Sequence, residues 1–196
     1  EWNTCRVILF TEYRATHSWL LEILASKGWG GDRLVCLHGG TDLDEREKIK
    51  AAFQAHPEAS PVRILLATDA ASEGIDLQNH CNFMIHVEIP WNPNVMEQRN
   101  GRIDRHGQKQ SEVCIWHPVP ADLDFDELKR LISQGNNRAV DLSSIEGEAE
   151  FLARAVLKVE QMREDLGCVG PVIAQQVEEG MLGRRSYLDT SGAEAK

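Results

Sequence analysis

Short apolar runs alternate with amphipathic stretches along the first 118 residues. The runs are rich in Val, Ile and Leu and are bounded by polar residues, which predicts buried parallel strands. Five runs have this character: 6–11, 34–37, 62–67, 82–87 and 113–116. Between them, residues 16–27, 45–55 and 95–105 predict helices, the first with Trp19 and Ile23 among its helically spaced apolar positions. This alternation predicts an α/β fold with a doubly wound parallel sheet.

The pattern changes after residue 118, where a polar turn introduces stretches with apolar positions at helical spacing. Three helices are predicted in this part: 125–133, 145–166 and 172–182. The end of the chain is polar and is expected to be disordered. The sequence therefore divides into three parts: an α/β domain at 1–118, an α-helical extension at 119–183 and a disordered tail at 184–196.

The richest polar stretch is 98–108, Gln-Arg-Asn-Gly-Arg-Ile-Asp-Arg-His-Gly-Gln, called here the arginine segment. Its arginines, Arg99, Arg102 and Arg105, are each three residues apart, so a helix or tight turn would stack their guanidinium groups along one side. Close positive charges repel, and planar guanidinium groups bind phosphate oxygens well, so the spacing indicates a polyphosphate ligand. The alternative is a solvated basic face.

Charge and composition limit the kinds of partner. The formal net charge is −10, with −4 in residues 1–118 and −6 in residues 119–196. Neither part is broadly basic, so any contact with nucleic acid is expected to be local. No apolar run is long enough to span a bilayer, and the first residues do not form a signal peptide. We expect a cytoplasmic protein without membrane contact, and the start on a strand without Met suggests a piece of a larger one.

Several cofactor-binding patterns are absent from the sequence. The five cysteines lie far apart and the seven histidines show no ligand spacing, so we expect neither a disulfide framework nor a metal site. No Gly-x-x-x-x-Gly-Lys-Ser/Thr loop is present to cradle nucleotide phosphates, and no Asp-Glu pair ends a strand to hold Mg²⁺. The chain by itself is therefore expected not to hydrolyse ATP.

Polar segments follow the predicted strands in a specific order. Segment 68–78 (Thr-Asp-Ala-Ala-Ser-Glu-Gly-Ile-Asp-Leu-Gln) follows the third strand, 91–93 (Trp-Asn-Pro) follows the fourth, and the arginine segment comes next. Together with the strand at 7–13, this order resembles motifs IV, V and VI of the second RecA-like lobe of superfamily 2 helicases and translocases. The Trp-Asn-Pro and the terminal Gly-Gln resemble the Swi2/Snf2 branch, above all bacterial members such as the RNA polymerase-associated ATPase. The resemblance covers about residues 6–118.

This resemblance implies a RecA-like three-layer parallel sheet, the second lobe of a P-loop NTPase-type motor, with a C-terminal α-helical extension. In the family, ATP and Mg²⁺ lie between two lobes; the first binds the phosphates and Mg²⁺, and the second brings arginines. By the resemblance, Arg102 and Arg105 are the catalytic arginine fingers. The alternative for both is an internal salt bridge with Asp104, Glu97 or Asp69.

Four further residues are assigned to ATP binding by the same resemblance. Gly74 allows a close backbone approach, and Asp76 reaches the nucleotide ribose or organises the arginine segment. Gln98 and Arg99 hold the arginine segment against segment 68–78. For Asp76 the alternative is a simple turn carboxylate.

Contacts with nucleic acid are assigned to residues near the ends of predicted strands. By family analogy Thr68 hydrogen-bonds a nucleic-acid phosphate, and Thr11 and the turn at His38 and Gly39 are further candidates. Trp91 stacks on a base or on the partner lobe, with burial as the alternative. For His38, a turn histidine bonded locally is an equal alternative.

The sequence thus predicts the second motor lobe of an ATP-dependent, Snf2-like translocase. Its expected partners are the N-terminal RecA-like lobe of the same protein and nucleic acid, above all duplex DNA, in a bacterial nucleoid. Asp104 stands where the Snf2 pattern more often has His, which leaves a strand-separating DNA or RNA helicase open. A non-catalytic module whose acidic helical extension binds a protein partner is a second hypothesis. A Rossmann-like enzyme is disfavoured because no glycine fingerprint follows the first strand.

Overall fold

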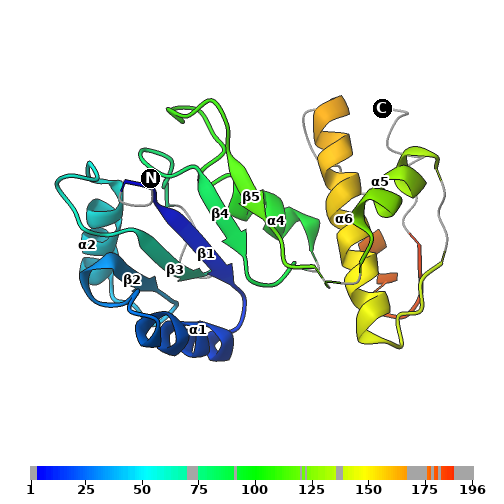
Figure 1. Ribbon diagram of the computed structural model, residues 1–196, viewed down its shortest axis with the longest axis horizontal. Helices are drawn as coiled ribbons and strands as arrows, with labels where there is room; N and C mark the ends of the chain where they lie inside the picture. The colour runs from blue at the N-terminus through cyan, green and yellow to red at the C-terminus, as the bar shows by residue number, and fades with distance from the viewer. Residues whose placement is uncertain are drawn as a thin grey trace. The chain divides into compact units, whose positions relative to one another are not determined.

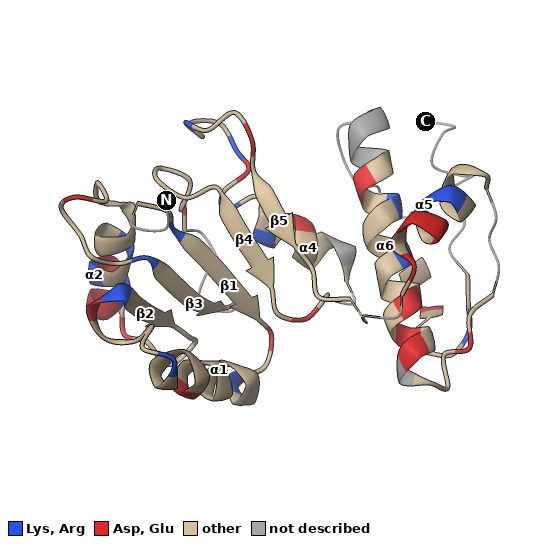
Figure 2. Ribbon diagram, viewed as in Figure 1, with Lys and Arg blue, Asp and Glu red and all other residues tan. Residues whose placement is uncertain are grey.

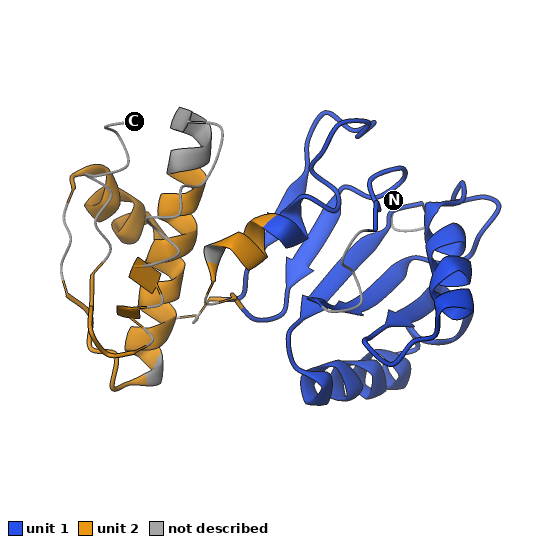
Figure 3. Ribbon diagram, turned by 180° about the vertical axis from the view of Figure 1, so that it is seen from behind, with its two compact units in different colours: residues 1–88, 98–118 blue, residues 89–97, 119–196 orange. Residues whose placement is uncertain are grey.

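The computed structural model describes residues 4–69, 75–90, 92–119, 121, 123–135, 139–166, 176–177, 179–180 and 182–187. The chain forms two compact units, which Figure 3 shows in two colours. Unit 1 contains residues 1–88 and 98–118, and unit 2 contains residues 89–97 and 119–196. Unit 1 therefore holds the arginine segment together with the strands.

Unit 1 is built on a five-stranded parallel sheet with the strand order β2-β3-β1-β4-β5 (Figure 1). Each predicted apolar run forms one strand: β1 (Val7–Thr11), β2 (Leu34–Leu37), β3 (Ile64–Thr68), β4 (Phe83–His86) and β5 (Cys114–Trp116). Val7 in the central β1 pairs with Ile64 of β3 and with Phe83 of β4, so these strands begin level with one another. Their carboxyl ends consequently share one edge of the sheet, and the predicted α/β fold is confirmed.

One face of the sheet is covered by helix α2 (Leu43–Gln54) and by the arginine segment. Ile8 and Phe10 of β1 point to this face and pack with Phe53 of α2, and all three side chains are fully buried. Asp42 caps the helix by accepting a hydrogen bond from a backbone N–H of its first turn. The main core therefore lies between β1, β3 and α2.

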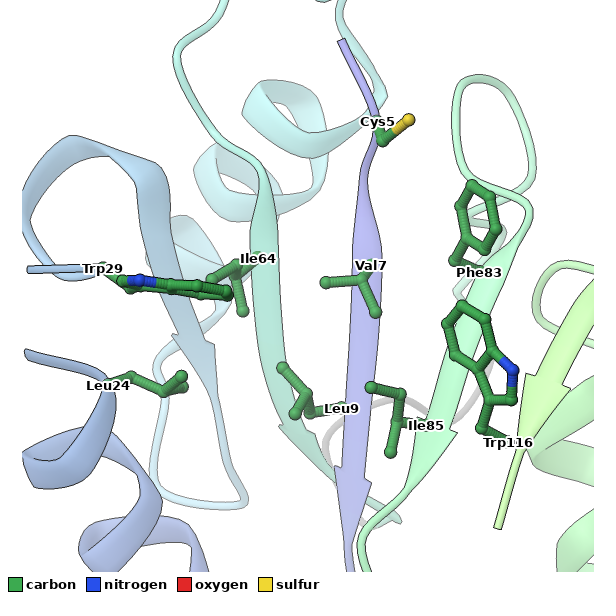
Figure 4. A pocket seen from close by; sticks show the side chains of 9 residues that line it. All are labelled: Cys5, Val7, Leu9, Leu24, Trp29, Ile64, Phe83, Ile85 and Trp116. Carbon is green, nitrogen blue, oxygen red and sulfur yellow. The ribbon is translucent and has the colours of Figure 1, made fainter. Parts of the chain in front are cut away.

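Helix α1 (Arg14–Ser26) lies on the opposite face and covers it only in part, so helices occupy both faces of the sheet. An open apolar groove of about 300 Å³ occupies the rest of this face (Figure 4). Its lining is drawn from the strands, from α1 and from the loop after α1: Cys5, Val7, Leu9, Leu24, Trp29, Ile64, Phe83, Ile85 and Trp116. The rings of Phe83 and Trp116 stack with their centroids 5.5 Å apart.

Only part of the predicted apolar spacing of helix α1 turns toward the sheet: Leu20 and Leu24 are half-buried, and Leu24 lines the groove. Trp19 and Ile23 are 56% and 39% exposed, whereas the buried residue of the helix is His17. The Nε2 atom of His17 lies 3.3 Å from the carbonyl oxygen of Leu66 in β3. His17 thus makes a polar contact with the sheet, while the indole of Trp19 is exposed to solvent.

Unit 2 contains helices α5 (Phe125–Ser133) and α6 (Ile145–Leu166), both predicted from the sequence. Asp124 caps α5 by accepting a hydrogen bond from a backbone N–H of its first turn. Leu128 of α5 packs against Leu157 of α6 in a small core cluster. Acidic side chains occupy the first turn of α6, where they complement the helix dipole (Figure 2).

The rest of the predicted extension is described only in fragments. The predicted helix at 172–182 falls mostly outside the described residues, and so does the predicted tail from residue 188 onward. Among the helices that the structure describes, none combines the length and the apolar character needed to cross a membrane.

Candidate functional site

Helix α4 (Pro93–Asn100) carries the beginning of the arginine segment and ends within it, whereas the sequence predicted a helix at 95–105. Beyond Asn100 the chain turns, and the carbonyl oxygen of Arg102 accepts a hydrogen bond from Leu77 N at 3.0 Å. Ile103 enters the main core and is fully buried. These two contacts draw the backbone out of the helix, so the three arginines diverge instead of lining one side.

Arg99 is the buried member of the three, with a side chain that is 1% exposed. Its Nε and Nη2 donate to the two carboxylate oxygens of Asp69 at 2.6 and 2.7 Å. The guanidinium also lies over the ring of Phe10, 5.6 Å from its centroid. Asp69 directly follows β3, so this bidentate pair ties the arginine segment to the carboxyl edge of the sheet.

Two histidines adjoin Arg99 on the same side of the sheet. His86 ends β4 and is fully buried; its Nδ1 lies 3.2 Å from Arg99 Nη1 and its Nε2 lies 2.8 Å from Asn100 Oδ1. The ring of His117 stacks on it at a centroid distance of 4.6 Å. Burial, with repulsion from His117 and Arg99, lowers the pKa of His86 to about 3, and burial lowers the pKa of His117 to about 4. Both rings are therefore neutral at pH 7.

Arg102 and Arg105 lie beyond the helix end and nearer to solvent. Nη1 of Arg105 forms an ion pair with Oδ1 of Asp76, and the two side chains are 41% and 54% exposed. Arg102 is half-buried, and its Nε is a buried donor without a hydrogen-bond partner among the described residues. Gln54 donates to the carbonyl oxygen of Asp76. Asp76 is thus in contact with the arginine segment.

The other polar residues of the arginine segment are divided between the surface and the turn. Gln98 is exposed. Gln108 Nε2 donates to the carbonyl oxygens of Cys81 and Ile103 at 3.0 and 2.9 Å, which fastens the turn near the start of β4. Gly107 has a φ of +91°, a conformation that residues with a Cβ rarely adopt, so the turn favours glycine at this position.

Thr11 and Thr68, both predicted to contact nucleic acid, end two neighbouring strands. Thr11 is fully buried, and its hydroxyl donates to Glu88 Oε1 at 2.7 Å. The same oxygen accepts from the backbone N–H of Glu12 at 2.6 Å, so Glu88 organises the turn between β1 and α1. Thr68 is 6% exposed. The hydroxyl of Thr11 is thus engaged within the protein.

His38 organises the turn after β2. Its Nδ1 accepts from the backbone N–H of Gly40 at 3.1 Å, and its own N–H donates to Thr41 Oγ1 at 3.1 Å. The ring meets that of His17 edge-on, with the centroids 5.6 Å apart. Gly39 is exposed at the tip of the turn. His38 therefore makes the local bonds that the sequence left open as an alternative.

Gly74 and Trp91 lie outside the described residues. The predicted role of Gly74 in ATP binding stays a prediction, and so does the predicted role of Trp91 in nucleic-acid contact.

Sequence reasoning did not identify His86 or Glu88 as members of this site. The only signal is that two polar side chains stand in and just after the apolar run at 82–87, where a buried strand would otherwise stay apolar. Asp69 was named only as an alternative partner of the fingers, and its partner is Arg99.

The assembled site is suited to an anion. It presents the partly exposed guanidinium of Arg105 to solvent. Within the described ranges, no group of three or more His, Cys, Asp or Glu side chains could hold a metal ion. The chemistry that these residues can perform is therefore stabilisation of negative charge.

Comparison with known proteins gives matches that centre on the α/β part of the chain. The profile of the helicase conserved C-terminal domain family matches residues 3–107. The protein YqhH of Bacillus subtilis (strain 168), described as an uncharacterized ATP-dependent helicase, is 41% identical over 112 residues, which are 57% of this chain and 18% of YqhH. The RNA polymerase-associated protein RapA of Vibrio campbellii (strain ATCC BAA-1116) is 29% identical over 160 residues, 76% of this chain and 16% of RapA.

Among solved structures, the C-terminal part of the Fun30 ATPase domain matches with a TM-score of 0.52 and 20% identity, over 81% of this chain and 48% of that one. This likeness shows the fold. The chain spans less than a fifth of the length of the two curated relatives, at 18% and 16%.

Proposed function

Because this chain belongs to the helicase conserved C-terminal domain family, and its relatives include an ATP-dependent helicase and the Snf2-branch protein RapA, we propose that it is the second motor lobe of an ATP-dependent translocase on nucleic acid. The lobe supplies Arg102 and Arg105 as arginine fingers to ATP bound by a first RecA-like lobe of the same protein. Closure of the lobes on ATP, and their opening after hydrolysis, moves the protein along the nucleic-acid backbone. Duplex DNA is the proposed track.

The observation that carries this proposal is the different anchoring of the arginines. Arg99 forms a bidentate pair with Asp69 in which the arginine is buried and the carboxylate is 31% exposed, whereas Arg105 is held by an exposed pair with Asp76. An exposed pair contributes only about 0–1 kcal/mol, so a phosphate can replace Asp76 as the partner of Arg105. We assign the half-buried Arg102, three residues earlier in the same segment, to the same ligand.

The residues of this chain fit the charge of a nucleotide but not its Mg²⁺, which we assign to the first lobe. ATP supplies the phosphoryl group whose transfer to water drives the motor. Arg102 and Arg105 stabilise the charge on that group, while Gly74 and Asp76 approach the nucleotide from segment 68–78. Arg99 and the exposed Gln98 keep the arginine segment in place. The chain alone is expected to be inactive because it lacks a phosphate cradle.

Contacts with nucleic acid are proposed along the carboxyl edge of the sheet. Thr68 and the exposed Gly39 contact the phosphate backbone, and Trp91 stacks on a base or on the first lobe. The side chains of Thr11 and His38 are bonded within the protein, so we assign them a role in shaping the turns that make these contacts. Such contacts carry no sequence information, which fits a motor that moves along any sequence.

A second function is favoured by the charge of the C-terminal part of the chain. Residues 119–196 carry a net charge of −6, and acidic side chains begin α6. This surface suits a basic protein partner that the motor would act on or be recruited by. Capture of such a partner would persist when Arg102 and Arg105 are both replaced by alanine, which separates this function from the motor.

The motor is tested by ATP hydrolysis in the natural protein that contains this chain, without nucleic acid and with duplex DNA, single-stranded DNA or RNA. The variants are Arg102→Ala and Arg105→Ala, with Arg33→Ala as a matched control. Arg33 is an exposed arginine in the short helix η1 (Gly31–Arg33). We expect duplex DNA to stimulate the parent and control proteins equally. The finger variants should lose about 10³-fold or more in rate.

Other results would change the assignment. Parental rates in both finger variants would show that the arginines are structural. Stimulation by single-stranded DNA or RNA, with separation of a labelled duplex, would identify a strand-separating helicase. ATP hydrolysis by the isolated chain would contradict the need for a first lobe.

A further inference from the structure

His86 contacts the arginine segment through both of its ring nitrogens. Nδ1 lies 3.2 Å from Nη1 of Arg99, and Nε2 lies 2.8 Å from Oδ1 of Asn100. Both partners belong to helix α4, while His86 ends the buried strand β4. The fully buried imidazole therefore joins the sheet to the start of the arginine segment.

The partners of His86 decide which nitrogen carries the proton. A guanidinium can only donate hydrogen bonds, so Nδ1 must accept from Arg99 and must be unprotonated. Nε2 then carries the hydrogen and donates to the amide oxygen of Asn100. A ring protonated on both nitrogens would place a second positive charge against Arg99 and would lose this bond.

We propose that His86 is a positioning residue for the motor: its Nδ1 holds Arg99 in the orientation that binds both carboxylate oxygens of Asp69. The inference rests on the proposed function, because its value to the protein is an arginine segment correctly placed for ATP hydrolysis. Without His86, the acceptor that Nη1 of Arg99 keeps among the described residues is the carbonyl oxygen of Glu88, at 3.3 Å. The guanidinium would then rotate away from the geometry that matches Asp69.

Neighbouring groups keep the imidazole in this orientation. The ring of His117, which follows β5, stacks on His86 with an angle of 21° between the ring planes. Phe10 of β1 packs on another side with a centroid distance of 6.4 Å. The ring therefore has aromatic contacts on two sides, and its nitrogens are fixed on Arg99 and Asn100.

Two substitutions of His86 test the contributions of its two ring nitrogens separately. In His86→Asn, the side-chain oxygen occupies nearly the place of Nδ1 and can accept from Arg99. In His86→Gln, the terminal amide reaches the place of Nε2, next to Asn100, and leaves Arg99 without its acceptor. A role in packing alone predicts the opposite ranking, because Gln is closer to His in volume.

The experiment compares kcat and KM for nucleic-acid-stimulated ATP hydrolysis in the natural protein containing this chain. We expect His86→Asn to keep a kcat at least about 10-fold above that of His86→Gln, with similar KM values. The same pair of substitutions at His56, whose side chain is 62% exposed, serves as the control and should leave kcat unchanged. Melting curves confirm that each variant is folded at the assay temperature.

Equal losses in the two variants, or a better Gln variant, would overturn the proposal. Crystal structures of the variants provide a readout that does not depend on activity. We expect the bidentate pair between Arg99 and Asp69 in His86→Asn and a displaced guanidinium in His86→Gln. If the parent hydrolyses no ATP but the structures differ in this way, the motor assignment fails and the positioning by His86 stands. An undisturbed Arg99 in both variants contradicts the positioning itself.

Discussion

The two ends of the arginine segment place the same kind of side chain in opposite environments. Arg99, still within helix α4, is 1% exposed and fixed by Asp69 and His86. Arg105, six residues later, is 41% exposed and paired with the half-exposed Asp76. The buried arginine is bonded to Asp69, His86 and Glu88, whereas, among the contacts of the described residues, the exposed one is paired only with a carboxylate that is itself exposed. Arginines that look alike in the sequence of one motif thus differ in burial and in partner in the fold.

The largest expected difference between the two ends of the segment is a loss of catalysis with little loss of stability. Replacing Arg105 by Ala should lower nucleic-acid-stimulated ATP hydrolysis by about 10³-fold or more, because a finger acts on the transition state. The free energy of unfolding should fall by less than about 1 kcal/mol, since the pair with Asp76 is exposed. Steady-state kinetics and urea unfolding measure the two effects. A loss of several kcal/mol in the stability of Arg105→Ala would show that Arg105, like Arg99, holds the fold together.

The buried end should show its effect in stability. Arg99→Met removes the buried guanidinium with its hydrogen bonds to Asp69, His86 and Glu88, so the free energy of unfolding should fall by about 3 kcal/mol. Urea unfolding of this variant is compared with Arg33→Met, an exposed site that should change little. Adding Asp69→Asn to Arg99→Met should cost less than Asp69→Asn alone, because the two side chains act as a pair. Simple additivity would contradict that coupling.

Because the histidines beside Arg99 are buried and neutral, we expect the free energy of unfolding to fall in acid. Folding lowers the pKa of His86 from the ordinary value of 6.5 to about 3, so the unfolded chain binds the proton more tightly. The stabilisation is complete above pH 6.5 and is lost as the pH falls from there towards 3. At pH 5 the loss is about 2 kcal/mol from His86, and His117 acts in the same direction.

Urea unfolding between pH 7 and pH 5 checks this expectation. The variant His86→Asn lacks the titrating ring and should lose less stability over this range than the parent protein does. An identical pH profile in both proteins would show that His86 titrates normally in the folded state.

The smallest expected effect lies in the turn that ends the exposed part. Gly107→Ala forces a residue with a Cβ into a φ of +91°, which should cost about 1–2 kcal/mol in the free energy of unfolding. The same substitution at Gly101, where no positive φ is found, is the control. A stability of Gly107→Ala equal to that of the control would mean that the turn adapts without strain.

Much of the fold follows from the sequence because buried parallel strands appear in it as continuous apolar runs. All five strands were located from their apolar runs, and so were helices α1, α2, α5 and α6. The end of α4 was misplaced because Ile103 and the carbonyl oxygen of Arg102 bond to parts of the chain far away in sequence. The spacing of apolar and polar residues within the segment does not predict such long-range contacts.

The candidate site divides in the same way. The ordered motifs identified the arginine segment and its family, since they are local patterns. The different environments of Arg99 and Arg105 depend on Asp69, Asp76 and His86. These residues lie near the arginines only in the folded sheet. Equal spacing of the arginines suggested one cluster, whereas the turn after Asn100 separates them. Pairings across strands are therefore the part that a sequence pattern leaves undetermined.

The apolar groove on the second face of the sheet has a spectroscopic consequence. Two of its lining residues, Trp29 and Trp116, are 45% and 50% exposed, so their indoles are in contact with water in this structure. Indole emission moves to shorter wavelengths when the ring leaves water. The chain has five tryptophans, so a variant that keeps only Trp29 and Trp116 is needed. The wavelength of its emission would then report whether that face of the sheet is bare or covered, with no label added to the protein.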